Sequence, residues 1–141
     1  MRVAIIRSEY HREIGVSLEA KCVETLVKAG VPAKQIECFV APGCFEIPLL
    51  GQRLASRRRF DALIALGAVI RGETHHFDLV VGECARGVMD VSLSYDLPFI
   101  FEVLATYNLR DARRRAGNNR ANKGIEAART ALALLSAQSV F

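Results

Sequence analysis

The sequence predicts a three-layer α/β/α sandwich with a central four-stranded parallel sheet, in a flavodoxin-like arrangement. Two observations predict this class. Short apolar runs alternate with stretches of helical periodicity, which indicates a parallel sheet with helices on both faces. The run at 62–70 also contains no charged side chain, as is typical of a strand covered on both faces. The length of 141 residues, of which 51% are hydrophobic, fits one domain.

The first half of the chain supplies two strands and one long helix. The first strand is expected at Val3–Ile6. Apolar residues then recur every fourth position from Ile14 to Leu26, which predicts a helix, and Gly30 can end that helix in a left-handed conformation. The second strand is expected at Ile36–Val40.

The second half continues the alternation. A shorter helix is expected at about Ile47–Ser56, before the third strand at Ala62–Ile70. Apolar positions over Phe77–Val91 mark one face of the next helix. The fourth strand, Phe99–Leu104, is followed by a polar segment and by a last helix with apolar positions over Ile125–Leu135. In such sheets ligands bind outside the carboxyl ends of the strands.

Composition excludes several functional classes. The net charge of +4 suits an anionic small molecule as well as a nucleic acid, but no recognition helix or stacking β-face accompanies the charge, so we expect no nucleic-acid partner. No apolar run approaches the roughly 18 residues of a membrane span, and we identify no targeting segment, so the expected location is cytoplasmic. The four cysteines have no CxxC spacing and are expected to be reduced, buried thiols without a metal.

The sequence RGETHHFD, Arg71–Asp78, follows the third strand and leads into a helix. Its backbone N–H groups at a helix N-terminus form a natural anion site. The alternative is an ordinary cap, in which Thr74 caps the helix and Asp78 complements its dipole. Spacing alone favours the cap.

Two other loops at the same edge carry candidates with two interpretations each. Glu46 precedes a helix that Pro48 can begin, so it could satisfy the helix dipole or accept hydrogen bonds from a polyol. Tyr10 could cover the edge of the sheet or serve as a stacking platform for a flat ring.

Basic residues cluster in two places. Arg113, Arg114 and Arg115 cannot share one helix face, because neighbours are about 100° apart, so at most one or two address a single site. The others, and the run Arg57–Arg59, are expected to be solvated. Lys123 begins the last helix, where a cation opposes the dipole, and this misfit makes a functional role more credible.

Four stretches stand out as a set: PGCFEIP (42–48), DALIALGAVIRGETHHFD (61–78), LPFIFEVL (97–104) and RRAGNNRANKGIEAA (114–128). In this order and spacing they resemble the 6,7-dimethyl-8-ribityllumazine synthases, transferases of riboflavin biosynthesis. The resemblance implies a single domain of that family over residues 1–141. It implies condensation of 5-amino-6-(D-ribitylamino)uracil with 3,4-dihydroxy-2-butanone 4-phosphate to give the lumazine, phosphate and water, without metal or organic cofactor.

The resemblance also implies roles for individual residues. His76 corresponds to the histidine that shuttles protons, and Arg115 to the arginine that holds the substrate phosphate from a neighbouring subunit. Tyr10 stacks on the pyrimidine. The remaining expected binding residues are Gly43, Cys44, Phe45 and Glu46 for the ribityl chain, Val69 and Ile70 for the ring, Gly72, Glu73 and Thr74 for the phosphate, and Phe101 and Lys123 lent by the neighbouring subunit.

The sequence departs from the family pattern at several positions. Tyr10-His11 stands where Phe or Trp followed by Asn is usual, Cys44 replaces a common Ala, and Glu102 replaces a common Gly. These changes motivate an alternative function, a non-catalytic lumazine- or flavin-binding protein of the same fold.

The resemblance implies self-association, because it divides each site between two subunits. We expect a homopentamer or a dimer of pentamers. The first predicted strand begins almost at Met1, without most of the N-terminal extension that in the family can add to a neighbour's sheet. This feature favours the smaller assemblies over a sixty-subunit shell.

Overall fold

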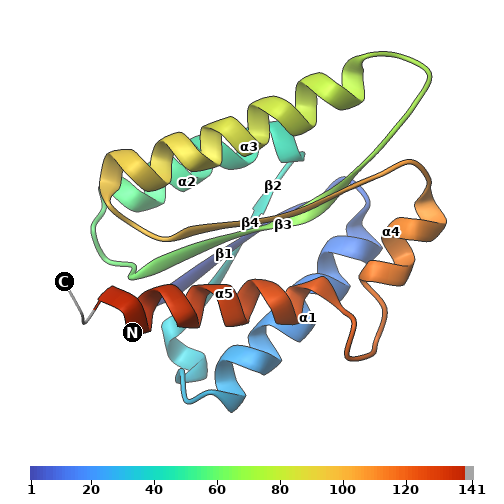
Figure 1. Cartoon of the computed structure of the whole chain (residues 1–141). Helices are drawn as coiled ribbons and strands as arrows, with labels where there is room; N and C mark the ends of the chain where they lie inside the picture. The colour runs from blue at the N-terminus through green and yellow to red at the C-terminus, as the bar shows by residue number, and fades with distance from the viewer. Residues whose placement is uncertain (139–141) are drawn as a thin grey trace.

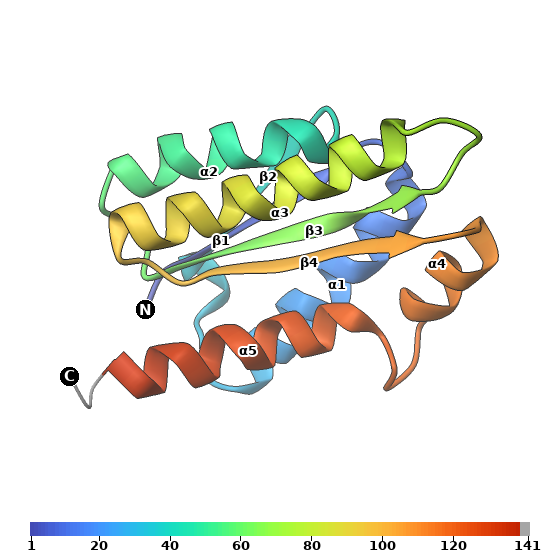
Figure 2. The same cartoon turned by 45° about the horizontal axis from the view of Figure 1, so that its top comes forward.

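The computed structural model describes residues 1–138, and in it a four-stranded parallel sheet lies between two helical layers (Figure 1). The strand order is β2-β1-β3-β4, so the predicted flavodoxin-like sandwich is confirmed. Helices α2 and α3 cover one face of the sheet and α1 and α5 the other (Figures 1 and 2). The elements are β1 (Val3–Ser8), α1 (Arg12–Lys28), η1 (Ala33–Gln35), β2 (Ile36–Ala41), η2 (Cys44–Glu46), α2 (Ile47–Ser56), β3 (Ala62–Ile70), α3 (His76–Tyr95), β4 (Phe99–Thr106), α4 (Leu109–Arg115) and α5 (Lys123–Gln138).

The strand β3 occupies the centre of the sheet and is buried along most of its length. Successive side chains of a strand point to opposite faces. Ile64 and Leu66 therefore join the core under α1 and α5, and Leu63 and Ala65 join the core under α2 and α3. This double burial explains why the sequence of β3 is apolar without alternation.

Helix ends agree with the sequence signals. Gly30 has φ 102°, the left-handed conformation expected after α1. Pro48 lies in the first turn of α2, where its missing N–H costs nothing. The predicted strands were too short, because β1, β2 and β4 continue to Ser8, Ala41 and Thr106. These polar or small residues end the hydrogen-bonded ladder at the edge where the loops begin.

One helix was missed. Helix α4 occupies part of the polar segment after β4, and its only buried residue is Ala112. Asn108 caps it, since its Oδ1 accepts a hydrogen bond from the backbone N–H of Asp111 at 2.8 Å. A short helix with a single buried residue has too little apolar periodicity to be recognised.

One surface expectation was wrong. Cys22, Cys44 and Cys84 are buried free thiols, but the free thiol of Cys38 lies on the exposed edge strand β2. Arg57, Arg58 and Arg59 are exposed, as expected, and Arg59 also contacts two other side chains. Its Nη2 donates to Glu37 Oε2 at 2.6 Å, and its guanidinium lies over the ring of Phe60 at 4.7 Å.

None of the helices within residues 1–138 combines the length and the apolar character that crossing a bilayer requires.

Candidate active site

A large pocket lies at the carboxyl ends of β1 and β3, bordered by η2 and the start of α3. Its volume is about 980 Å³. This is the edge of the sheet at which a flavodoxin-like fold binds ligands. Ten predicted site residues line it: Tyr10, Gly43, Cys44, Phe45, Glu46, Val69, Ile70, Gly72, Thr74 and His76.

The loop from β3 to α3 brings His76 to this pocket. The loop is anchored at its base, where the Arg71 N–H donates to the carbonyl of Thr106 on β4 at 2.9 Å. The Thr74 hydroxyl oxygen accepts a hydrogen bond from the His76 N–H at 3.3 Å. Thr74 lies just before the N-cap residue, His75, so it satisfies the first N–H of α3 and also lines the pocket.

The floor of the pocket contains a thiol. A Cβ on Gly67 would lie 2.8 Å from Cys44 Sγ, so the thiol fits only because residue 67 is glycine. Burial raises the pKa of Cys44 to about 11, with smaller opposing hydrogen bonds from Ser8 and the backbone of Ala68. The thiol therefore stays protonated at neutral pH, and a protonated thiol is a poor nucleophile.

Two aromatic side chains stand at the rim. Tyr10 is 69% exposed and Phe45 is 56% exposed, although both line the pocket. The ring of Tyr10 meets that of His11 edge to face at 4.7 Å, and His11 has a left-handed backbone with φ 55°. Such exposed rings give a flat ligand a surface on which to stack.

A second pocket, of about 720 Å³, lies between the end of α4 and the outer side of α5. It contains Arg115 and Lys123 and is rich in cations. The Arg115 Nη1 donates to the carbonyl of Asp111 at 3.1 Å, and Lys123 Nζ lies 2.7 Å from Glu126 Oε2. Glu126 thus offsets the unfavourable position of Lys123 at a helix start. The other charged lining residues are Arg114, Arg120 and Arg129.

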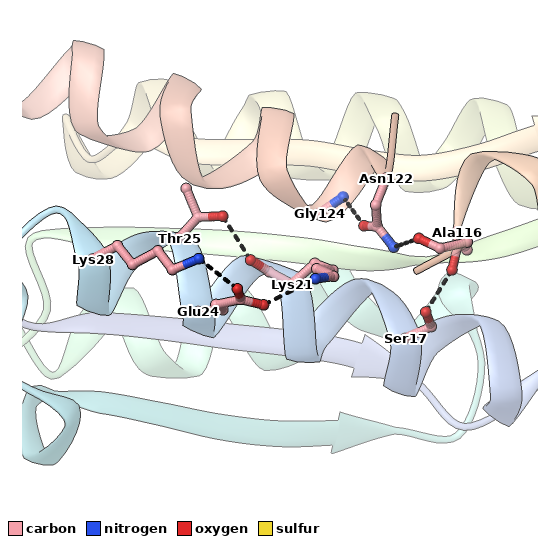
Figure 3. A network of polar contacts seen from close by, with 9 residues as sticks. Ser17, Lys21, Glu24, Thr25, Lys28, Ala116, Asn122 and Gly124 are labelled. Carbon is pink, nitrogen blue, oxygen red and sulfur yellow. Dashed lines mark hydrogen bonds and ion pairs between the residues drawn. The ribbon is translucent and has the colours of Figure 1, made fainter. Parts of the chain in front are cut away.

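The polar contacts of Asn122 and Gly124 fix the start of α5 beside this pocket (Figure 3). The buried Asn122 donates through Nδ2 to the carbonyl of Gly117 and accepts through Oδ1 from the Gly124 N–H, both at 2.8 Å. A Cβ on Gly124 would lie 2.1 Å from the carbonyl oxygen of Leu18, so α5 crosses α1 in backbone contact. The position of Lys123 follows from this close packing.

Glu102 is the most perturbed carboxyl near the second pocket. Burial raises its pKa to about 7, the nearby Glu126 raises it further, and Lys123 lowers it. Its neighbour Phe101 is half-buried and packs with the core on the α2 and α3 side. The two residues point to opposite faces of the edge strand β4.

The predicted site residues thus fall into three groups. The pocket at the sheet edge, called the strand-end pocket below, contains ten of them, and the second pocket, called the cation pocket, contains Arg115 and Lys123. Glu73 and Phe101 line neither. Sequence reasoning missed Glu83 in the strand-end pocket and named His11 only as a departure from the family pattern. Glu83 lies two helical turns after His76, so helical spacing was the signal that could have found it.

These features define the class: a flavodoxin-like α/β protein with a ligand-sized pocket at the carboxyl edge of its sheet. A family model described as 6,7-dimethyl-8-ribityllumazine synthase matches residues 1–139, and the chain belongs to that family. It is 44% identical to the 6,7-dimethyl-8-ribityllumazine synthase of Ruthia magnifica subsp. Calyptogena magnifica. It is 42% identical to the enzyme of the same name from Vesicomyosocius okutanii subsp. Calyptogena okutanii. Each comparison spans 139 residues and covers 95% of this chain and 83% of the relative.

Proposed function

We propose that this chain, as a single domain, is a 6,7-dimethyl-8-ribityllumazine synthase of riboflavin biosynthesis. It condenses 5-amino-6-(D-ribitylamino)uracil with 3,4-dihydroxy-2-butanone 4-phosphate and releases phosphate and water. The observation that carries the proposal is the strand-end pocket, where an exposed aromatic ring, a histidine and the N-terminus of α3 meet. These groups suit a flat pyrimidine, a proton transfer and a phosphate, respectively.

Different groups of the strand-end pocket suit different parts of the two substrates. Tyr10 provides the stacking surface for the pyrimidine, and Glu46 accepts hydrogen bonds from the ribityl hydroxyls. The backbone around Gly72 and Thr74 receives the phosphate at the N-terminus of the 20-residue helix α3. His76 moves the protons that Schiff-base formation and phosphate loss require.

The cation pocket completes the site from a neighbouring subunit. Arg115 supplies the fork of donors that a phosphate prefers, and Lys123 and Phe101 approach the ring end. Within residues 1–138, Arg115 and Lys123 line a different pocket from His76, which is the arrangement expected if one site needs two subunits. Head-to-tail contacts of this kind close into rings. We therefore propose a homopentamer, alone or as a dimer of pentamers.

The activity is tested by mixing the purified protein with the two substrates and following the absorbance of the lumazine. Stoichiometric release of phosphate and formation of the lumazine would support the proposal. Tight binding of the lumazine without turnover would instead establish the alternative, a binding protein of the same fold.

The assembly is tested by light scattering coupled to size exclusion. A mass of five or ten chains supports the ring, whereas an active monomer would refute the shared site. The proposed compartment is the cytoplasm, where the four free thiols would remain reduced. A cell fractionation in which the activity sediments with membranes would contradict that location.

A further inference from the structure

A buried arginine lies directly below the loop that carries Tyr10. Arg7 is on β1, and its side chain is only 9% exposed. Its Nη1 donates to Glu9 Oε2 at 2.7 Å, and its Nε lies 3.4 Å from Glu19 Oε2 on α1. Its Cδ is 3.6 Å from the position of a Cβ on Gly15, so α1 packs closely over the aliphatic part of the side chain.

This arrangement is costly for stability alone. Within residues 1–138, Arg7 Nε and Glu19 Oε2 are buried without a hydrogen-bond partner, despite their ion-pair distance. Burial raises the pKa of Glu19, and the charge of Arg7 only partly opposes this shift. A buried ion pair with unsatisfied atoms is often no more stabilising than apolar side chains of the same volume. Stability therefore gives little reason for a cation at this position.

The carboxylate of Glu9 connects the buried Arg7 to the start of α1. One oxygen of its carboxylate contacts Arg7, and the other lies 3.5 Å from Nη1 of Arg12, the first residue of α1. This single carboxylate thus links the end of β1 to the start of α1. Tyr10 and His11 lie between Glu9 and Arg12 in the sequence, and both line the strand-end pocket.

Backbone hydrogen bonds also hold the turn, since the carbonyl of His11 accepts from the N–H groups of Ile14 and Gly15 at 3.0 and 3.2 Å. The Glu9 N–H donates to the carbonyl of Ala41 at 2.8 Å, and the Ser8 hydroxyl donates to the carbonyl of Tyr10 at 3.3 Å. The side chain of His11, in its left-handed conformation, provides no cap for α1. The exposed Tyr10 ring has a ring contact with its neighbour His11, so the ion pairs of Glu9 on either side of the turn help to keep it in one orientation.

We propose that Arg7 is a positioning residue of the pyrimidine subsite, acting through Glu9 to hold the turn from Ser8 to His11. This inference rests on the proposed function for the identity of the ligand. The holding of the turn by Arg7 and Glu9 can be tested without that assumption.

Two variants interrupt the link in different ways. Glu9→Ala removes the exposed carboxylate and leaves the buried pair intact. The double variant Arg7→Met/Glu19→Gln removes both buried charges together, so that neither remains buried alone and the fold is retained. The matched control is Arg2→Met, which removes an exposed ion pair with Glu37 at the opposite end of β1.

Amide hydrogen exchange of the intact assembly is measured first. We expect faster exchange over residues 8–15 in both test variants, with unchanged exchange in the strands and in the control. Unchanged exchange over this segment in either test variant would overturn the proposal, whether or not the protein is a synthase.

Steady-state kinetics then test the role in binding. We expect both test variants to raise KM for the pyrimidine by about 3- to 10-fold, the cost of ordering one or two side chains, with little change in KM for the phosphate substrate. Faster exchange with equal effects on the two KM values would overturn the positioning role. An inactive wild type would refute the proposed function alone, because the exchange experiment decides the holding of the turn independently.

Discussion

The two pockets of this chain are built in different ways. The strand-end pocket is formed by loops that leave a buried sheet, so the backbone largely fixes its shape. The cation pocket is formed by long side chains of α4 and α5 and of the turn between them. The first offers aromatic rings, histidines and the carboxylates of Glu46 and Glu83, and the second offers mainly positive charge beside the carboxylate of Glu126. Under the proposed function, the flat ring and the phosphate of the two substrates use both kinds of surface.

From this contrast we expect the substitution with the largest effect on activity to lie in the strand-end pocket. His76→Ala should slow the condensation by about 10- to 1,000-fold, the range of one acid–base group. Much rate should survive, because the positioning of the two reactants contributes separately. The measurement is kcat at saturating concentrations of both substrates. The matched control is His75→Ala, because the neighbouring His75 side chain is 99% exposed and does not line the pocket. Equal rates for His76→Ala and wild type would remove His76 from the mechanism.

In the cation pocket the expected effect is on binding. Arg115→Ala should raise KM for the phosphate substrate by about 10- to 100-fold, as for loss of a charged hydrogen bond, with a much smaller change in KM for the pyrimidine. The control is Arg113→Ala. Arg113 pairs with Glu13 at 2.8 Å and lines neither pocket. Equal changes in both KM values would indicate that Arg115 is structural.

A smaller effect is expected from the acid beside the cation pocket. The pKa of Glu102 is about 7 in the folded protein, compared with 4.5 for a glutamate that is not perturbed by its environment, as in the unfolded chain. The folded state therefore binds more protons between these pH values, and the free energy of unfolding falls as the pH rises from 4.5 to 7. Glu102→Gln should remove this fall and stabilise the protein above pH 7 by roughly 1–2 kcal/mol, after allowance for solvent screening at a half-buried site.

Urea unfolding at pH 4.5 and pH 8 measures this difference. The variant and the wild type should agree at the lower pH and diverge at the higher one. If the variant and the wild type differ by the same free energy of unfolding at pH 4.5 and pH 8, Glu102 is not the group that takes up the proton on folding.

The sequence was sufficient for the parts of the fold that depend on apolar periodicity. The run at 62–70 predicted the bounds of β3, and Pro48 indicated the start of α2. It was insufficient where few apolar residues are involved. Helix α4 has one buried residue and is held by its Asn108 cap and by α1, since the Ser17 hydroxyl donates to the carbonyl of Ala116. Cys38 was misplaced because β2 is an edge strand, and the order of the strands is not contained in their composition.

The candidate site was predictable to a similar degree. Glycine, histidine and aromatic residues at strand ends indicated the strand-end pocket. Arg7 gave no signal, since an arginine near the end of a strand is normally exposed. Its importance comes from burial against α1, a contact between segments separated in the sequence. Arg129 lines the cation pocket and Glu83 the strand-end pocket, and both positions depend on which face of the helix is turned toward the pocket.

The central claim is that one site takes its histidine and its phosphate arginine from different subunits. The direct test is complementation between His76→Ala and Arg115→Ala, after the two purified variants are unfolded together and reassembled as mixed rings. Activity is measured at a phosphate-substrate concentration far below the KM of Arg115→Ala. Random mixing of equal amounts should give wild-type sites at about one quarter of the interfaces, so the mixture should regain about that share of the wild-type rate. A mixture no more active than the average of the two variants would show that each subunit supplies a whole site, and would contradict the account.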